Sequence, residues 1–273
     1  MSNTQVNINA GELLLQEHCE GGILRLTLND MKRRNALSEE MMTALGDALQ
    51  QAESNTSVRV IILAANGPAF CAGHDLKQMT AGRNSADNGQ AYFTYVLSTC
   101  SSLMQSLVNH SKPIIAEVTG VATAAGCQLV ASCDLAVAAD TASFSTPGVH
   151  IGLFCSTPMV ALSRCVSNKA AMEMLLTGGM LSALKAERIG LVNQVVVDKS
   201  LTEATMVMAS TIASKSSMTL ATGKKAFYTQ REMTLPDAYH YASQVMVENM
   251  LKHDAEEGIN AFIEKRSPTW QDK

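Results

Sequence analysis

The sequence is poor in aromatic and charged residues and has no long uninterrupted apolar run. Aromatic side chains make up 4% of the 273 residues and charged ones 17%, against 47% hydrophobic residues. This composition provides material for a sizeable core and excludes a disordered chain. The most apolar stretch, residues 113–139, contains Glu117, Gln128 and Asp134. It therefore does not predict a membrane span, which needs about 18 or more apolar residues in succession.

An excess of positive charge is also lacking. The 21 Lys and Arg residues stand against 25 Asp and Glu residues, which leaves a formal net charge of -4. General nucleic-acid binding is therefore disfavoured, because it requires many cationic side chains to neutralise phosphates. The first 18 residues contain no arginine and no basic segment followed by a long apolar run. This pattern predicts a protein without a targeting segment, located in the cytoplasm.

The seven cysteines do not form a metal-binding pattern. No two of them have CxxC spacing, and no pair of histidines completes a zinc site. We therefore expect no bound metal. Buried, reduced thiols are the expected state of cysteines in a reducing compartment.

Hydrophobic patterns predict strands alternating with helices over the first two-thirds of the chain and helices over the last third. The predicted strands are 13–18, 23–28, 58–64, 113–118, 135–138, 143–145 and 192–197. A helix follows Ser38, and further helices are predicted at 93–108, 128–132, 158–166, 169–176, 183–189, 201–214, 217–229, 236–251 and 255–264. The alternation is typical of an α/β protein with a mostly parallel sheet. We expect a core domain at 13–200, a helical C-terminal region at 201–268, and flexible tails at 1–12 and 269–273.

At two places a buried strand is followed by small residues and the start of a helix. These are residues 69–76 and residues 119–128. Backbone N–H groups at such a junction have no partner within the helix and can point at a developing negative charge. Two such groups that converge on one oxygen form an oxyanion hole. The alternative is that the glycines and alanines only permit close packing.

Around these residues the sequence resembles the enoyl-CoA hydratase/isomerase family, also called the crotonase superfamily. The resemblance runs from about Leu13 to Pro268. Within the family, residues 146–158 are most similar to the enoyl-CoA hydratase domain-containing protein 3 branch. The matching segments, in the family's order, are 35–37, 70–76, 112–116, 125–129, 132–135, 190–192, 257–258 and 261–266.

The resemblance implies a fold, a substrate and an assembly. The fold is a crotonase-type spiral of ββα turns with a helical C-terminal trimerisation region, in a homotrimer or a dimer of trimers. The substrate is an acyl-CoA thioester of lipid or fatty acid metabolism, with no cofactor beyond the coenzyme A that the substrate carries. The backbone N–H groups of His74 and Ala125 hold the thioester carbonyl. The coenzyme A moiety contacts Ala36, Ala72, Asp75, Leu76, Lys77, Phe262 and Lys265, and the run 32–34 can add positive charge for its phosphates.

The sequence departs from the family where hydration needs two carboxyl groups. The positions of the family's two glutamates hold Gln128 and Gly148, and the position used by some isomerases holds Ser156. Neither an amide nor a glycine can exchange a proton at this step. We therefore expect weak hydration by an enzyme of lyase or isomerase type. Candidate substitutes are His150, Cys155 and Ser156. The alternative function is a non-catalytic acyl-CoA-binding or scaffold protein.

Overall fold

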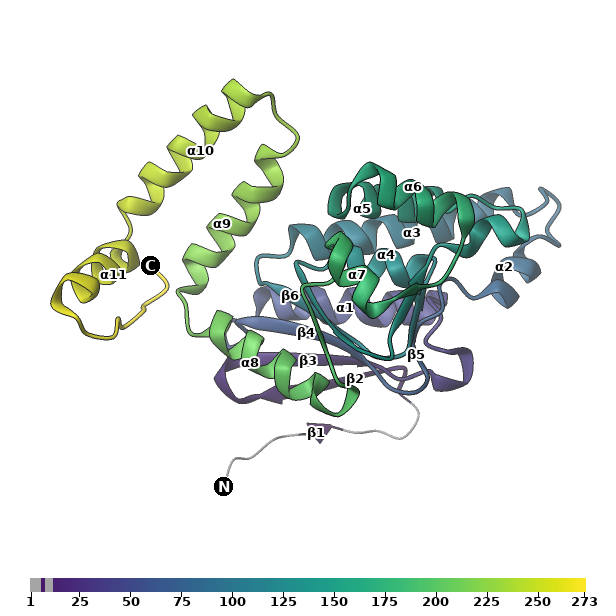
Figure 1. The fold of residues 1–273 in the computed structure, drawn as a ribbon, viewed down its shortest axis with the longest axis horizontal. Coiled ribbons are helices and arrows are strands. Elements are labelled where there is room, and N and C mark those ends of the chain that lie inside the picture. Colours follow the sequence, from purple (N-terminus) through teal and green to yellow (C-terminus); the bar gives the residue numbers. More distant parts are fainter. Residues whose placement is uncertain (1–5, 8–11) are drawn as a thin grey trace.

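The computed structural model describes Val6–Asn7 and residues 12–273, in two sheets and a set of surrounding helices (Figure 1). Of the N-terminal tail predicted at residues 1–12, positions 1–5 and 8–11 lie outside the described residues. The combination of strands and helices confirms the α/β class.

The larger sheet has seven strands. Its first two pairs, β1 with β2 and β2 with β3, are antiparallel, and the remaining pairs are parallel. Strand β4 is buried along almost its whole length, as expected for a parallel strand covered on both faces. In spatial order the strands are β1 (Val6–Asn7), β2 (Leu14–Cys19), β3 (Ile23–Leu28), β4 (Val60–Ala65), β6 (Ile114–Val118), β8 (Leu135–Ala139) and β11 (Gln194–Val196).

The smaller sheet was not fully predicted from the sequence. Its order is β10 (Leu181–Ser182), β9 (Ser143–Ser145), β7 (Val121–Thr123) and β5 (Ala69–Cys71). Strands β5, β7 and β9 are parallel to one another. Strands β5 and β7 lie in segments that we expected to be loops, because three residues are too few to show an alternating pattern and glycine and proline surround them.

The helices have the following bounds: α1 (Glu39–Ser54), α2 (Leu76–Gly82), α3 (Gln90–Asn109), α4 (Ala125–Ser132), α5 (Ser156–Cys165), α6 (Asn168–Thr177), α7 (Ala183–Ile189), α8 (Leu201–Ala213), α9 (Ser217–Gln230), α10 (Leu235–Met250) and α11 (His253–Glu264). Helix α1 begins as its sequence predicts, since the Ser38 side chain accepts a hydrogen bond from the Met41 N–H at 3.2 Å. Among the residues that the structure describes, no helix is both long enough and apolar enough to cross a membrane.

The C-terminal helices divide between the core and a projecting arm. Helix α8 packs against β3, β4, β6 and β8, so the predicted helical region at 201–268 begins with a helix of the core. Helices α9, α10 and α11 extend away from it, on the left of Figure 1.

The segment 269–273, expected to be a flexible tail, contacts both the arm and the end of core helix α8. The Trp270 indole N–H donates to the Ser214 carbonyl at 2.9 Å. The Asp254 carboxylate accepts the N–H groups of Gln271 and Asp272, at 2.8 and 2.9 Å.

All seven cysteines are free thiols, and five of them are buried: Cys71, Cys100, Cys127, Cys133 and Cys155. Burial raises the pKa of Cys71 and of Cys127 to about 12. These thiols are therefore protonated at neutral pH and pack as small apolar side chains.

The packing of helix α4 on strand β5 yields a stability prediction. A Cβ placed on Gly126 would lie 2.0 Å from the Cys71 carbonyl oxygen, whereas a Cβ on Gly223 of α9 would meet nothing within 4 Å. We expect Gly126→Ala to lower the free energy of unfolding by about 1–3 kcal/mol, because backbone must shift to relieve the clash. Gly223→Ala is the control, with an expected gain of up to about 1 kcal/mol from helix propensity. Chemical denaturation measures both, and equal stability of the two variants would contradict this packing.

Candidate active site

The site predicted from the sequence lies at one edge of the smaller sheet. His74 follows strand β5, Ala125 follows β7 and Gly148 follows β9. Since these three strands are parallel and adjacent, their carboxyl ends meet at the same edge. The structure thus brings together the two predicted oxyanion-hole residues and one of the two glutamate positions from three separate parts of the chain.

The loops after β5 and β7 are in direct contact. A Cβ on Gly73, which has φ +96°, would lie 2.9 Å from the Ala124 Cβ and 3.4 Å from the Ala125 nitrogen. Glycine therefore permits both the left-handed backbone and the close approach. Ala124 itself has φ +51°, a conformation that costs energy for an L-residue. This strained residue is held by the hydrogen bond from its N–H to the Ser145 carbonyl, at 2.9 Å.

Two backbone donors on these touching loops are unpaired. In the described part of the chain, neither the His74 N–H nor the Ala125 N–H donates to a protein acceptor. By contrast, the Gln128 N–H donates to the Ala124 carbonyl at 3.0 Å. The Ala125 donor also lies at the positive end of helix α4. Unpaired backbone N–H groups are the kind of donor that an oxyanion hole uses.

Buried polar side-chain atoms without a partner occur on the segments at the carboxyl ends of β5, β7 and β9. They are Gln128 (Oε1), Ser145 (Oγ), Thr146 (Oγ1) and both ring nitrogens of His74. The described residues contain one other such atom, Nδ2 of Asn249 on helix α10. Buried polar groups are normally paired, so a concentration of unpaired ones marks a place where a ligand or water can bind. The sequence singled out Gln128 and His74 as site candidates but not Ser145 or Thr146, although Thr146 begins the run 146–158 that resembles one branch of the family.

Gly148 is enclosed by its own loop. A Cβ at this position would lie 2.8 Å from the Leu153 carbonyl oxygen and 2.9 Å from the Cys155 sulfur. Any larger residue at 148 therefore requires the segment 148–155 to move.

Three residues are candidates to replace the missing glutamates, and of these only Cys155 lies against Gly148. Burial raises the pKa of its thiol, against an opposing effect of the Gly148 backbone. The exposed His150 ring contacts the Gly178 carbonyl through Nε2 at 3.3 Å, and the exposed Ser156 hydroxyl faces the Phe154 carbonyl at 3.4 Å. These contacts direct the His150 ring toward Gly178 and the Ser156 hydroxyl toward Phe154.

The segments expected to contact coenzyme A lie side by side. The Ala72 N–H donates to the Arg34 carbonyl at 3.1 Å, and the Leu37 N–H donates to the Gly73 carbonyl at 2.8 Å. Buried Ala36 and half-buried Ala72 therefore lie on adjacent segments of the chain. Asn35, whose role the sequence did not reveal, fixes this arrangement: its side-chain amide donates to the carbonyls of Asn66 and Ala69, both at 2.8 Å.

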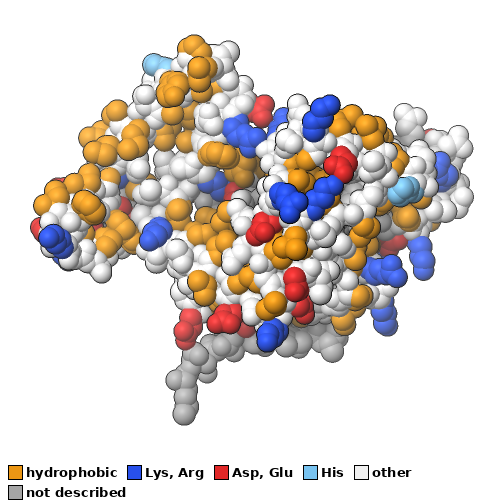
Figure 2. Space-filling view, in the orientation of Figure 1, with side chains coloured by type: hydrophobic (Ala, Val, Ile, Leu, Met, Phe, Trp, Pro, Cys, Tyr) orange, Lys and Arg blue, Asp and Glu red, His pale blue; other side chains and the backbone are white. Residues whose placement is uncertain are grey.

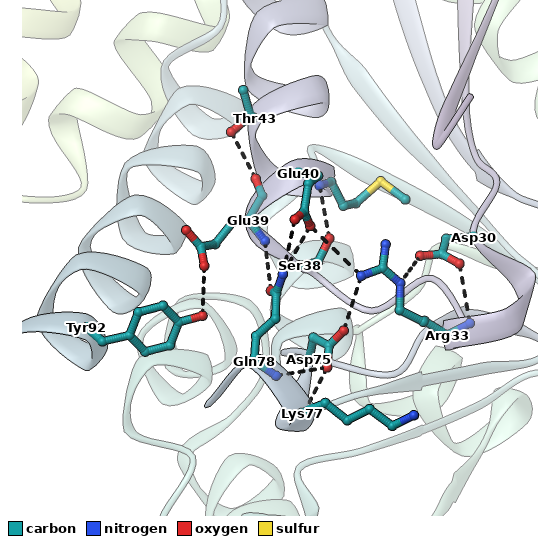
Figure 3. Close-up of polar contacts among 11 residues, drawn as sticks. Asp30, Arg33, Ser38, Glu39, Glu40, Thr43, Asp75, Lys77, Gln78 and Tyr92 are labelled. Atoms are coloured by element: carbon teal, nitrogen blue, oxygen red, sulfur yellow. Dashed lines mark hydrogen bonds and ion pairs between the residues drawn. The ribbon is translucent and has the colours of Figure 1, made fainter. Parts of the chain in front are cut away.

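Asp75 has a structural role at the start of helix α2 (Figure 3). Its carboxylate accepts the N–H groups of Lys77 and Gln78, at 2.9 and 3.3 Å, and pairs with Arg33 at 3.3 Å. Arg33 also contacts Asp30, so it is less available for a ligand than its neighbours in the run 32–34. The exposed Leu76 and Lys77 follow on α2, with the Lys77 side chain directed away from Asp75.

Phe262 and Lys265 are not brought to this site. Phe262 lies in the last turn of α11 and Lys265 directly follows this helix, which lies at the opposite end of the molecule from α2 (Figure 1). Phe262 is 86% exposed. Within one chain, these two residues cannot contact a ligand bound beside Lys77.

A cavity of about 980 Å³ adjoins the site. It lies among helices α3, α4, α5 and α9, and Gln128 and Ser132 of α4 form part of its wall. Gln128 is thus common to the cavity and to the candidate catalytic positions. Among the residues that the structure describes, no group of three or more His, Cys, Asp or Glu side chains is placed to hold a metal ion.

The burial of His74 yields a prediction on pH dependence. Burial lowers the pKa of its imidazole, with a smaller opposing effect of the Leu37 backbone. The unfolded chain therefore takes up a proton at a higher pH than the folded protein, and stability is lost as the pH falls through the ordinary histidine value of about 6.5. We expect His74→Asn to reduce this loss between pH 7.5 and 5, and His240→Asn, at an exposed position, to leave it unchanged. Denaturation at several pH values measures the effect, and an identical pH dependence in His74→Asn would contradict it.

Comparison with known proteins identifies the family of the chain. The enoyl-CoA hydratase/isomerase family model matches residues 18–273. The rat enoyl-CoA hydratase domain-containing protein 3, named mitochondrial, is 50% identical over 252 residues, which cover 92% of this chain and 82% of the rat protein. The human relative of the same name is 49% identical over 250 residues, covering 91% of this chain and 80% of that protein.

Two solved structures show the same fold. The enoyl-CoA hydratase of Mycobacterium smegmatis superposes with a TM-score of 0.91 at 48% identity, covering 95% of this chain and 99% of its own. The human enoyl Coenzyme A hydratase domain-containing protein 3 gives a TM-score of 0.89 at 45% identity, covering 95% of this chain and 100% of its own.

The expected cytoplasmic location is wrong, since the rat, mouse and human relatives are all named mitochondrial. The expectation depended on the composition of the first 18 residues, which does not determine where the folded domain acts. The predicted family is confirmed by both kinds of comparison. This chain belongs to the enoyl-CoA hydratase/isomerase family, the crotonase superfamily, in the branch of enoyl-CoA hydratase domain-containing protein 3.

Proposed function

We propose that the protein binds an acyl-CoA thioester and stabilises enolate-like charge on its carbonyl oxygen with the N–H groups of His74 and Ala125. One observation carries this proposal: two unpaired backbone donors lie on touching loops at the carboxyl edge of the smaller sheet. Donors that are fixed before the reaction need no reorganisation when charge develops, which makes this a large catalytic effect. Membership of the family supports the same class of substrate.

Coenzyme A binds, in this proposal, beside helix α2, along the adjoining segments that contain Ala36 and Ala72. Exposed basic residues, Lys32, Arg34 and Lys77, are available there for its phosphates. Figure 2 shows Lys and Arg side chains on the side of the molecule where Figure 1 places α2. The coenzyme A carried by the substrate is the one cofactor in the proposal.

The proposed activity on simple enoyl thioesters is weak. The buried Gln128 amide can hydrogen-bond to a water but cannot accept its proton. Gly148 offers no side chain and no room for one. The site therefore stabilises charge on the thioester without the two proton-transferring carboxyl groups that hydration uses.

A homotrimer, or a dimer of trimers, is the proposed assembly. The projecting helices α10 and α11 expose apolar side chains that include Leu235, Tyr239, Met246 and Phe262, and Figure 2 shows hydrophobic groups over this arm. Phe262 and Lys265 then contact the coenzyme A bound by a neighbouring subunit, since they cannot reach the site of their own chain. A solution mass equal to one chain would refute the assembly.

A second candidate function is a non-catalytic acyl-CoA-binding protein. The observation in its favour is the packing around Gly148, because Leu153 and Cys155 occupy the space that a catalytic glutamate side chain would need. Both functions share the binding step. They differ in whether any carbon–hydrogen or carbon–oxygen bond of the acyl group changes.

Displacing the two loops tests the binding step. A methyl group at Gly73 forces its loop away from Ala124, so Gly73→Ala separates the two donors. We expect it to weaken binding of acetoacetyl-CoA, whose enolate resembles the proposed bound state, by about 10-fold or more in calorimetric titration. Gly21→Ala is the matched control, because Gly21 has φ +74° with nothing within 4 Å of an added Cβ. No binding of acetyl-CoA or a longer acyl-CoA to the unaltered protein at millimolar ligand would sink the proposal.

Restoring one carboxyl group tests the activity. We expect Gln128→Glu to raise the hydration of crotonyl-CoA by about 10²-fold, because a carboxylate can take the proton of the attacking water. Gln105→Glu makes the same change elsewhere on the cavity wall and is expected to have no such effect. Turnover is followed by loss of enoyl absorbance. Rapid hydration by the unaltered protein, unchanged in Gln128→Ala, would show that the proton-transferring groups lie elsewhere.

A further inference from the structure

The helices of the projecting arm are held to the core in different ways. Helix α9 has a direct anchor, because the Lys224 ammonium pairs with Asp134 at 2.7 Å and donates to the Leu107 carbonyl at 3.0 Å. Helix α11 packs on α10 and stands further along the arm. After α11 the chain turns back, so that residues 269–273 lie beside the start of α9 (Figure 1). The contacts of this returning segment show how α11 is held.

The returning segment is bound to α11 at two places. Asp254, in the first turn of the helix, accepts the N–H groups of Gln271 and Asp272 at 2.8 and 2.9 Å. The Trp270 ring lies against Gly258, where an added Cβ would meet two ring carbons at 3.1 and 3.2 Å. Asp254 is buried, so a carboxylate that lost these two donors would keep the full cost of its desolvation. Helix α11 and the returning segment therefore form one unit.

The same segment is bound to the junction between α8 and α9, residues 213–217. The Asp272 carboxylate accepts the Ser217 N–H at 2.6 Å, and the Trp270 indole N–H donates to the Ser214 carbonyl at 2.9 Å. Ser217 is the first residue of α9, so the charge of Asp272 lies at the positive end of that helix. The unit that contains α11 is thus tied to the point where the arm leaves the core.

Arg59 connects these contacts to the core. Its guanidinium pairs with Asp272 at 2.9 Å and donates to the carbonyls of Ala213 and Lys215, at 2.8 and 2.6 Å. Its backbone N–H donates to the Gly22 carbonyl at 2.7 Å, directly before strand β3. One arginine therefore joins the core, the junction and the returning segment.

We propose that Arg59, Trp270 and Asp272 form a clasp that holds α11 in the position from which Phe262 and Lys265 reach a neighbouring subunit. This inference rests on the proposed function, from which it takes the homotrimer and the shared coenzyme A site. Without the clasp, α11 turns about its connection to α10 and has to be ordered when it docks. That ordering costs conformational entropy and weakens association, whereas a helix that is already fixed docks without this cost.

The fluorescence of Trp270 reports the clasp directly, because it is the one tryptophan of the chain. Asp272→Ala removes the acceptor of the Ser217 N–H and the partner of Arg59 while it keeps the tryptophan. We expect its emission to shift to longer wavelength and its quenching by acrylamide to increase, since a released indole is exposed to water. Asp272→Asn keeps an oxygen acceptor, and its emission is expected to lie between the two. Asp47→Ala, at an exposed position of α1, is the matched control and leaves the emission unchanged.

Sedimentation of the full-length protein over a range of concentrations is the second measurement. Asp272→Ala is expected to dissociate into single chains at a protein concentration about 10-fold or more above that of the unaltered protein, the size of one lost charge-assisted hydrogen bond. The circular dichroism spectrum is expected to stay the same, because the sheets and the Lys224 anchor of α9 are not altered. A general loss of structure would change both.

The outcomes separate the clasp from the assembly. Unchanged Trp270 emission in Asp272→Ala overturns the clasp, and so does a released Trp270 with unchanged assembly; the trimer stands in both cases. An unaltered protein that sediments as a single chain at every concentration overturns the proposed assembly and this inference with it. If Asp272→Ala does not fold, Trp270→Phe keeps a ring against Gly258 without the indole N–H and is expected to weaken assembly in the same direction. Unchanged assembly in that variant overturns the clasp.

Discussion

The contact between the loops that follow β5 and β7 is the constraint on which the site depends. Gly73 lets the loop after β5 approach Ala124 so closely that an added Cβ would clash, and Gly126 at the start of α4 does the same against Cys71 of β5. The same approach keeps Ala124 in a strained backbone conformation and leaves the first N–H of α4 unpaired. In the proposed function, this strain accompanies the placement of two donors before a substrate arrives, as in a preorganised site.

The positions at which hydration uses two carboxyl groups hold Gln128 and Gly148 in this chain. In the proposed function, a tightly folded loop around Gly148 and a buried amide at Gln128 stand at the positions of the proton-transferring groups, and the backbone donors of His74 and Ala125 stabilise charge. A protein of this kind can bind a thioester and polarise it without being a fast hydratase. Helix α9, which Lys224 anchors to Asp134, gives the cavity beside Gln128 a fixed wall.

The sequence predicted the long elements well, because a helix such as α1 shows both its periodicity and its cap at Ser38. It did not predict β5 and β7, whose three residues carry too little pattern. For the site, the motifs indicated His74 and Ala125, but the reason for glycine at 148 became visible only in the packing of Leu153 and Cys155. The separation of Lys265 from Lys77 is likewise a property of the fold, which local sequence does not contain.

The central claim is that the thioester carbonyl is polarised by two backbone donors, and vibrational spectroscopy of the bound carbonyl tests it most directly. An acyl-CoA labelled with ¹³C at the thioester carbonyl allows its C=O stretch to be separated from the protein amide bands. The account predicts that this stretch moves to lower frequency on binding, because hydrogen bonds from His74 and Ala125 weaken the double bond. A bound thioester whose carbonyl frequency equals that in water would contradict the account.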